Sequence, residues 1–143
     1  MFVPVHGTPR DADLMRGSYL KGSTLVLPSQ CAGLSAHIGM ELFALNAGME
    51  RVGFYKTDYL APVVMNDAMT LAGATMGSIT LPAEIWFSAE RNMTLLMIRS
   101  SPTGGMRKFA DELVAFIMMT DFARVVLLTS TLSPVSRERD SNR

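Results

Sequence analysis

The fold of this chain follows from residues 24–55, which read TLVLPSQCAGLSAHIGMELFALNAGMERVGFY. A short apolar strand over 25–27 opens this stretch and ends at Pro28, and a second strand over 52–55 closes it. Between them a loop leads into a helix predicted over 34–48, where Gly48 fits a left-handed cap after the last turn. A strand, a helix and a strand in this order form the unit from which parallel sheets covered by helices are built.

The predicted helix carries apolar residues on two opposed sides. With 3.6 residues per turn, one stripe contains Leu34, Ile38, Leu42, Leu45 and Met49. The opposite stripe contains Ala36, Met40, Phe43, Ala44 and Ala47. A helix on the outside of a sheet needs only one apolar face, so two faces indicate that a second layer covers it. That layer is either a later part of the same chain or another protein, and we predict that the second stripe binds a partner.

The rest of the chain predicts a β-hairpin and a second strand–helix–strand unit. Residues 83–89 alternate in polarity, a turn follows at 90–92, and 94–98 form the return strand of the hairpin. Its continuously apolar part, 95–98, suits a strand buried on both faces. A glycine-containing break then opens a helix over 106–119 with a single apolar stripe. Residues 124–130 read as another strand buried on both faces, which completes a right-handed crossover.

These elements predict an α/β fold with a mostly parallel sheet, one antiparallel hairpin and helices on the faces of the sheet. We expect a single domain over 1–132 and a polar, disordered tail over 133–143. Residues before the first strand read as an extended arm and a loop, 62–65 are compatible with a short strand, and 66–78 read as a loop. Two long helices are few for a sheet of five or six strands. We therefore expect that the chain is incomplete at its C-terminus or that another chain supplies the missing cover.

Composition narrows the class of protein. The chain has 143 residues, of which 48% are apolar and 18% charged, and its 13 basic and 13 acidic residues cancel. No basic patch appears, so nucleic acid is not an expected partner. No apolar run reaches the roughly 18 residues that a membrane span requires. The single cysteine, Cys31, allows no disulfide within the chain, and no secretory signal is visible, so we expect a soluble intracellular protein.

The motifs of catalysis and metal binding do not assemble in this sequence. The loop after the first strand has one glycine, whereas a dinucleotide site needs three. Ser35 and His37 are two positions apart and do not face each other on a helix. Cys31 before the helix is either an inert thiol or a nucleophile. We predict no catalytic residue, cofactor or metal. The alternative is a small-molecule enzyme, phosphorylase-like or hydrolase-like, with Asp58 or Ser35 at the strand ends.

Several stretches resemble the proteasome assembly chaperone 2 family. The most specific is VGFYKTDYLAPVV at 52–64, and MFVP at 1–4, LVLP at 25–28 and ARVVLLTS at 123–130 also match the family pattern. The resemblance extends to about Ser130. It implies an α/β fold shaped like purine nucleoside phosphorylases, a three-layer sandwich, without catalysis and without a cofactor.

The resemblance also implies a function. Family members pair with proteasome assembly chaperone 1, bind α subunits of the 20S proteasome and promote α-ring formation in the cytoplasm and nucleus. They are longer than this chain, and some end in a hydrophobic–tyrosine–any tail, whereas this chain ends Ser-Asn-Arg. We therefore expect a truncated gene product or a fragment. The predicted function is that of a non-enzymatic chaperone of proteasome assembly.

Overall fold

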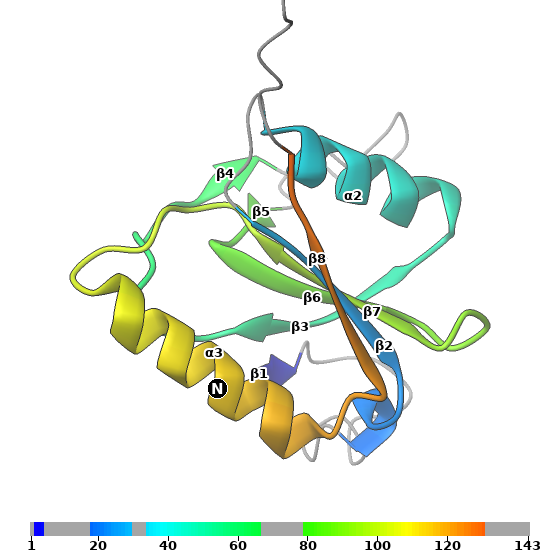
Figure 1. Cartoon of the computed structure of the whole chain (residues 1–143). Helices are drawn as coiled ribbons and strands as arrows, with labels where there is room; N and C mark the ends of the chain where they lie inside the picture. Colours follow the sequence, from blue (N-terminus) through cyan, green and yellow to red (C-terminus); the bar gives the residue numbers. More distant parts are fainter. Residues whose placement is uncertain (1, 5–17, 30–33, 67–78, 131–143) are drawn as a thin grey trace, which may run out of the picture.

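A six-stranded sheet lies between two helices, which gives three layers (Figure 1). The computed structural model describes residues 2–4, 18–29, 34–66 and 79–130. The strand order in the sheet is β1-β3-β6-β7-β2-β8. The strands are β1 (Phe2–Pro4), β2 (Thr24–Pro28), β3 (Glu50–Tyr55), β6 (Ala83–Ser88), β7 (Met93–Ile98) and β8 (Arg124–Leu128). A separate ladder joins β4 (Met65–Asn66) to β5 (Ile79–Thr80), and a 3-10 turn covers Ser18–Leu20.

The two crossover units predicted from the sequence are present. Helix α2 (Ser35–Asn46) connects β2 to β3, and helix α3 (Met106–Thr120) connects β7 to β8. Both helices begin and end within two residues of their predicted limits. Gly48 follows α2 with φ 58°, the left-handed conformation that its position predicts, and its N–H donates to the carbonyl of Leu45.

The sheet is mixed, because the hairpin enters its middle. Among the described strands, β2, β3, β7 and β8 run in the same direction, as a mostly parallel sheet requires. Strand β6, however, lies between β3 and β7 and pairs antiparallel with both. Strand β1, predicted only as an extended arm, adds antiparallel to β3. As a result, only the β2–β7 and β2–β8 pairings are parallel.

Each face of the sheet has its own apolar core. On one face Leu25 and Leu27 of β2 pack with Phe109 of α3. On the other face Val26 packs with Met40 and Ala44 of α2. The alternation along β2 therefore places the two helices on opposite faces and confirms the three-layer arrangement.

Strand β8 differs from its prediction as a strand buried on both faces. Val125 is 45% exposed and Leu127 58% exposed. The reason is position: β8 is the last described strand of the sheet and pairs with β2 alone. Val126 and Leu128 on one face are half-buried against the core beneath α2, whereas the opposite face, with Val125 and Leu127, is exposed. The predicted tail over 133–143 and most of the predicted loop over 66–78 lie outside the described residues.

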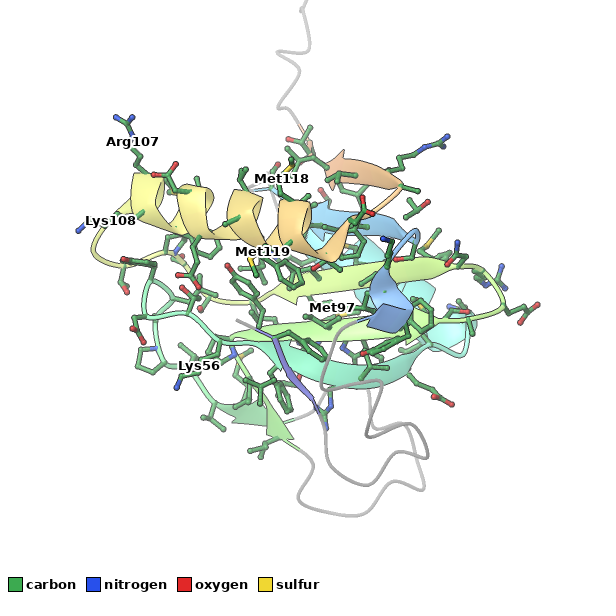
Figure 2. The ribbon with its side chains drawn as sticks, turned by 90° about the horizontal axis from the view of Figure 1, so that it is seen from below. Lys56, Met97, Arg107, Lys108, Met118 and Met119 are labelled. Atoms are coloured by element: carbon green, nitrogen blue, oxygen red, sulfur yellow. The ribbon has the colours of Figure 1, made fainter. Side chains whose placement is uncertain are left out.

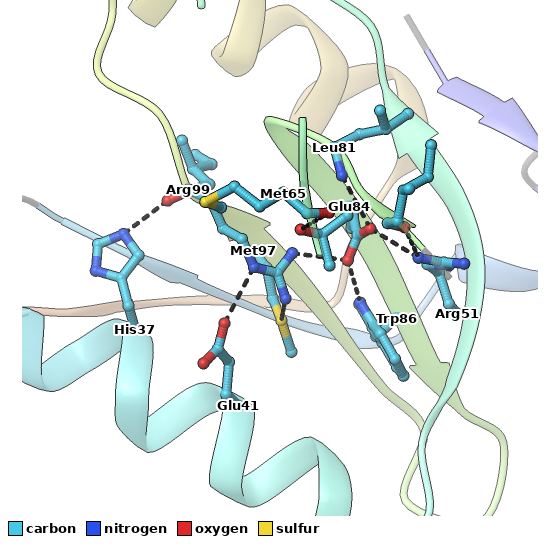
Figure 3. Close-up of polar contacts among 12 residues, drawn as sticks. His37, Glu41, Arg51, Met65, Leu81, Glu84, Trp86, Met97 and Arg99 are labelled. Carbon is cyan, nitrogen blue, oxygen red and sulfur yellow. Dashed lines mark hydrogen bonds and ion pairs between the residues drawn. The ribbon is translucent and has the colours of Figure 1, made fainter. Parts of the chain in front are cut away.

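A fully buried carboxylate joins three strands (Figure 3). Glu84 of β6 accepts hydrogen bonds from Arg51 Nη1 in β3 at 2.9 Å and from Arg99 Nη1, just after β7, at 2.7 Å. The backbone N–H of Leu81 and the indole Nε1 of Trp86 each donate to it at 3.2 Å. Four donors compensate for the lost hydration of the carboxylate, without which burial of an isolated charge is strongly unfavourable.

The same cluster reaches helix α2. Arg99 Nε donates to Glu41 Oε1 at 3.0 Å, and the Arg99 side chain is only 8% exposed. Arg99 therefore bridges Glu84 in the sheet and Glu41 on the helix, as Figure 3 shows. This bridge fixes which side of α2 lies on the sheet.

We predict that Glu84→Gln lowers the free energy of unfolding by about 3 kcal/mol, because it removes the buried negative charge that compensates the guanidinium groups of Arg51 and Arg99. Glu41→Gln is the matched control. Its carboxylate is 33% exposed, so we expect a loss of less than about 1 kcal/mol. Urea unfolding of both variants measures the difference. Equal losses would show that Glu84 is no more important than a surface ion pair.

We predict opposite effects for Gly53→Ala and Gly39→Ala. A Cβ at Gly53 would overlap the Phe2 ring and come 2.7 Å from the Val3 carbonyl oxygen, so the contact with β1 should weaken by about 1–3 kcal/mol. A Cβ at Gly39 meets nothing within 4 Å on α2, so alanine should stabilise the helix by about 0.5–1 kcal/mol. The midpoints of urea unfolding report both signs. A stabilised Gly53→Ala protein would contradict the placement of β1.

Candidate functional site

Helix α2 exposes an apolar stripe on the side away from the sheet. We call the following four residues the outer stripe of α2: Leu34 (62% exposed), Ile38 (52%), Leu42 (56%) and Leu45 (37%). They recur at the helical spacing that the sequence predicts, so they form one continuous strip. No described element covers this strip. A run of large exposed apolar side chains on a rigid element is typical of a protein interface.

The opposite stripe of α2 packs on the sheet of the same chain. Ala36, Met40 and Ala44 are at most 8% exposed, and Met40 and Ala44 belong to the core that contains Val26. This placement corrects the prediction that Ala36, Met40 and Ala44 face a partner. The physical reason is that two apolar sides look alike in a sequence, whereas small alanine side chains let the helix approach the sheet closely.

The other two residues of that predicted partner surface lie toward its edge. Phe43 is 39% exposed, and Ala47 is partly buried against the same core. A role in partner binding stays a prediction for Phe43 and Ala47.

Helix α3 has an exposed outer side of a different character. Its first turn carries Arg107 and Lys108, which point away from the sheet in Figure 2. Its last turn carries Met118 and Met119, which are 75% and 86% exposed. Methionine is flexible and frequent at adaptable binding surfaces. This side is therefore a second exposed apolar region. Its side chains are unbranched methionines rather than leucine and isoleucine, and two positive charges lie at the other end of the helix.

A cavity of about 710 Å³ lies where β2 and β7 end, between the two helices. Its lining includes the loop residues Pro28 and Ser29 after β2 and 99–102 after β7. The helices contribute apolar side chains, among them Leu34 from α2 and Phe109 from α3. Among the described residues that line it, Arg99 is the only arginine, lysine, aspartate or glutamate. The cavity is therefore chiefly apolar.

Two buried polar atoms at this cavity lack a hydrogen-bond partner in the described part of the chain. His37 Nε2 lies 2.6 Å from the carbonyl oxygen of Ile98, as Figure 3 shows. A carbonyl can only accept, so Nε2 carries the hydrogen and Nδ1 of the neutral ring is left as an acceptor. Nδ1 has no donor, and the hydroxyl of Ser100 has no partner either. Both residues line the cavity.

The residues of the enzyme alternative are not brought to this cavity. Ser35 and Asp58 are exposed, and neither lines it or a second cavity of about 290 Å³ beside β3. Cys31 lies outside the described residues. The described residues contain no group of three or more histidine, cysteine, aspartate or glutamate side chains able to hold a metal ion. The described helices are also too short or too polar to cross a membrane.

The segment that follows β3, which includes Asp58, is connected to helix α3. The Thr57 hydroxyl donates to Glu112 Oε2 of α3 at 2.9 Å. Burial raises the pKa of the nearby Tyr55 phenol, and the negative charge of Glu112 raises that pKa further. The phenol therefore stays protonated, and this region joins β3 to α3.

Comparison with known proteins matches the chain to the PAC2 family over residues 25–142. Curated relatives named Proteasome assembly chaperone 2 are similar over most of the chain. The relative from Nematostella vectensis is 29% identical over 133 residues, covering 91% of this chain and 52% of the relative. The relative from Homo sapiens is 27% identical over 134 residues, covering 93% of this chain and 48% of the relative. The chain thus spans about half the length of these relatives.

A solved structure supports the same architecture. It is a protein with unknown function from Thermoplasma acidophilum, with a TM-score of 0.59 and 11% sequence identity. The similarity covers 87% of this chain and 49% of that one, and at this identity it bears on the fold alone. The α/β fold and the family match agree over most of the sequence. The chain belongs to the PAC2 family.

Proposed function

We propose that this chain takes part in proteasome assembly as a non-enzymatic chaperone that acts by binding other proteins. Relatives named Proteasome assembly chaperone 2 align with 91% and 93% of the chain, which supports this assignment. The observation that carries it in the structure is the outer stripe of α2, because a chaperone of assembly requires an accessible surface for a partner.

The outer stripe suits a helix that docks into an apolar groove. Its side chains follow one another at spacings of three or four residues, which is the pattern of anchors in such complexes. The helix that presents them is rigidly placed, since Met40 and Ala44 pack beneath it and Glu41 pairs with Arg99. A preorganised helix loses little conformational freedom on binding, so more of the contact energy contributes to affinity.

We propose the partners that the family resemblance implies. One is proteasome assembly chaperone 1, in a heterodimer, and the others are α subunits of the 20S proteasome, whose ring formation the pair promotes. Phe43 and Ala47, at the edge of the stripe that packs on the sheet, extend the contact. The proposed location is the cytoplasm and nucleus, and the proposed mechanism uses no cofactor.

We predict that Ile38→Glu and Leu42→Glu each weaken binding to this partner by about 30-fold, the loss expected when a central apolar anchor worth about 2 kcal/mol is replaced by a charge. Val114→Glu on α3 is the matched control, because Val114 is 56% exposed and Leu42 is also 56% exposed. Each tagged variant is expressed in cells of the organism from which the protein comes, and the proteins that co-purify with it are measured by quantitative mass spectrometry. Thermal unfolding checks that all variants are folded.

Recovery of proteasome α subunits together with proteasome assembly chaperone 1, lost in the two α2 variants and kept in Val114→Glu, supports the proposal. Recovery of general chaperones alone by the unmodified chain would contradict the function. A loss in Val114→Glu equal to that in Leu42→Glu would contradict the assignment to α2. Tagged chain found only outside the cytoplasm and nucleus would contradict the proposed location.

A further inference from the structure

The cavity occupies a special position in the topology of the sheet. Strands β2 and β7 are adjacent and parallel. The loop after β2 leads to α2 on one face of the sheet, and the loop after β7 leads to α3 on the other face. Two neighbouring loops that leave toward opposite faces open a crevice beyond the carboxyl ends of their strands. In open α/β sheets this crevice is where ligands bind.

The size and lining of the cavity fit a small uncharged molecule. Its volume of about 710 Å³ falls within the roughly 300–1,000 Å³ of small-molecule sites. The Arg99 guanidinium, the one permanently charged group that the described residues bring to the lining, is already paired with Glu41 and Glu84. A charged ligand would therefore lose its hydration without gaining a counter-charge, whereas an apolar one loses little.

The polar groups of the cavity favour a ligand that carries a hydrogen-bond donor. His37 Nδ1 is a buried acceptor with no partner among the described residues, and leaving a buried acceptor without a hydrogen bond is unfavourable. The hydrogen bond from Nε2 to Ile98 holds the ring in place, so Nδ1 has a fixed position. The Ser100 hydroxyl, for which the described part of the chain also offers no partner, can either donate or accept. A ligand N–H or O–H directed at His37 would satisfy the imidazole.

We propose that the cavity at the ends of β2 and β7 binds an uncharged, mostly apolar small molecule, and that His37 Nδ1 accepts a hydrogen bond from a donor on it. This site does not rest on the proposed chaperone function, although Leu34 belongs both to the cavity lining and to the outer stripe. Ile38 and Leu42, which test that function, do not line the cavity, so the two proposals succeed or fail independently.

The test uses two probes of nearly equal shape. Indole is flat and apolar with one N–H donor, and benzofuran replaces that donor with an oxygen acceptor. Both are titrated into the isotope-labelled full chain, and backbone amide shifts are followed by NMR. We expect shifts at Ser100 and neighbouring cavity residues, and at least about fivefold tighter binding of indole, which corresponds to one net hydrogen bond of about 1 kcal/mol.

Two variants identify the site. Ala110→Trp fills the cavity from α3 and should abolish binding of both probes. Met119→Trp, on the same helix at an 86% exposed position, is its matched control and should bind normally. His37→Phe keeps an aromatic ring but removes the acceptor, so benzofuran should still bind while the preference for indole disappears. Thermal unfolding of each variant confirms that it is folded.

The outcomes separate clearly. Indole binding that is lost in Ala110→Trp and loses its preference over benzofuran in His37→Phe supports the proposal. No binding of either probe up to its solubility limit would overturn it. Unchanged binding in Ala110→Trp would place the ligand elsewhere and overturn it as well. Equal affinity for the two probes in the unmodified chain would overturn the role of His37.

Discussion

The buried carboxylate of Glu84 is the interaction on which the arrangement of the three layers depends. It draws Arg51 from β3 and Arg99 from the end of β7 to one point within the sheet, and Arg99 extends the connection to Glu41 on α2. The net contribution of such a cluster to the free energy of unfolding is small, because desolvation of the charges offsets much of their attraction. Its contribution is geometric. Partners that must all be satisfied at once tolerate few alternative positions of the strands or of the helix.

Orientation of α2 follows from this cluster. Glu41 can reach Arg99 only when one side of the helix lies on the sheet. Ala36, Met40 and Ala44 then face inward, and the leucine-rich side faces outward. The same placement brings His37 against the Ile98 carbonyl at the rim of the cavity. One helix thus contributes to the sheet core, to an exposed apolar surface and to a ligand-sized cavity, and Leu34 at its start belongs to both of the last two.

The sequence predicts the individual helices and strands well, but it predicts poorly which strands lie next to each other in the sheet. Periodicity identifies both long helices within two residues of their limits and the hairpin over 83–98, because these signals depend on nearby residues. The insertion of β6 between β3 and β7 and the exposure of β8 depend on pairing between distant segments, which periodicity does not report. The sequence does not distinguish the inner side of α2 from the outer one, because both sides carry large apolar residues such as Met40 and Leu42. A glutamate in an otherwise apolar strand, with arginines 33 and 15 residues away, was the available signal for the cluster.

The exposed edge of strand β8 affects the concentration at which this protein stays soluble. One edge of β8 pairs with β2, and the other edge pairs with no described strand while Val125 and Leu127 are exposed. An open edge of this kind is a template for a strand from a neighbouring molecule. Encounters between two such edges rise with the square of concentration. The risk of aggregation through this edge therefore rises more steeply than the amount of protein, so the solubility of this protein depends on its concentration as well as on its own folding.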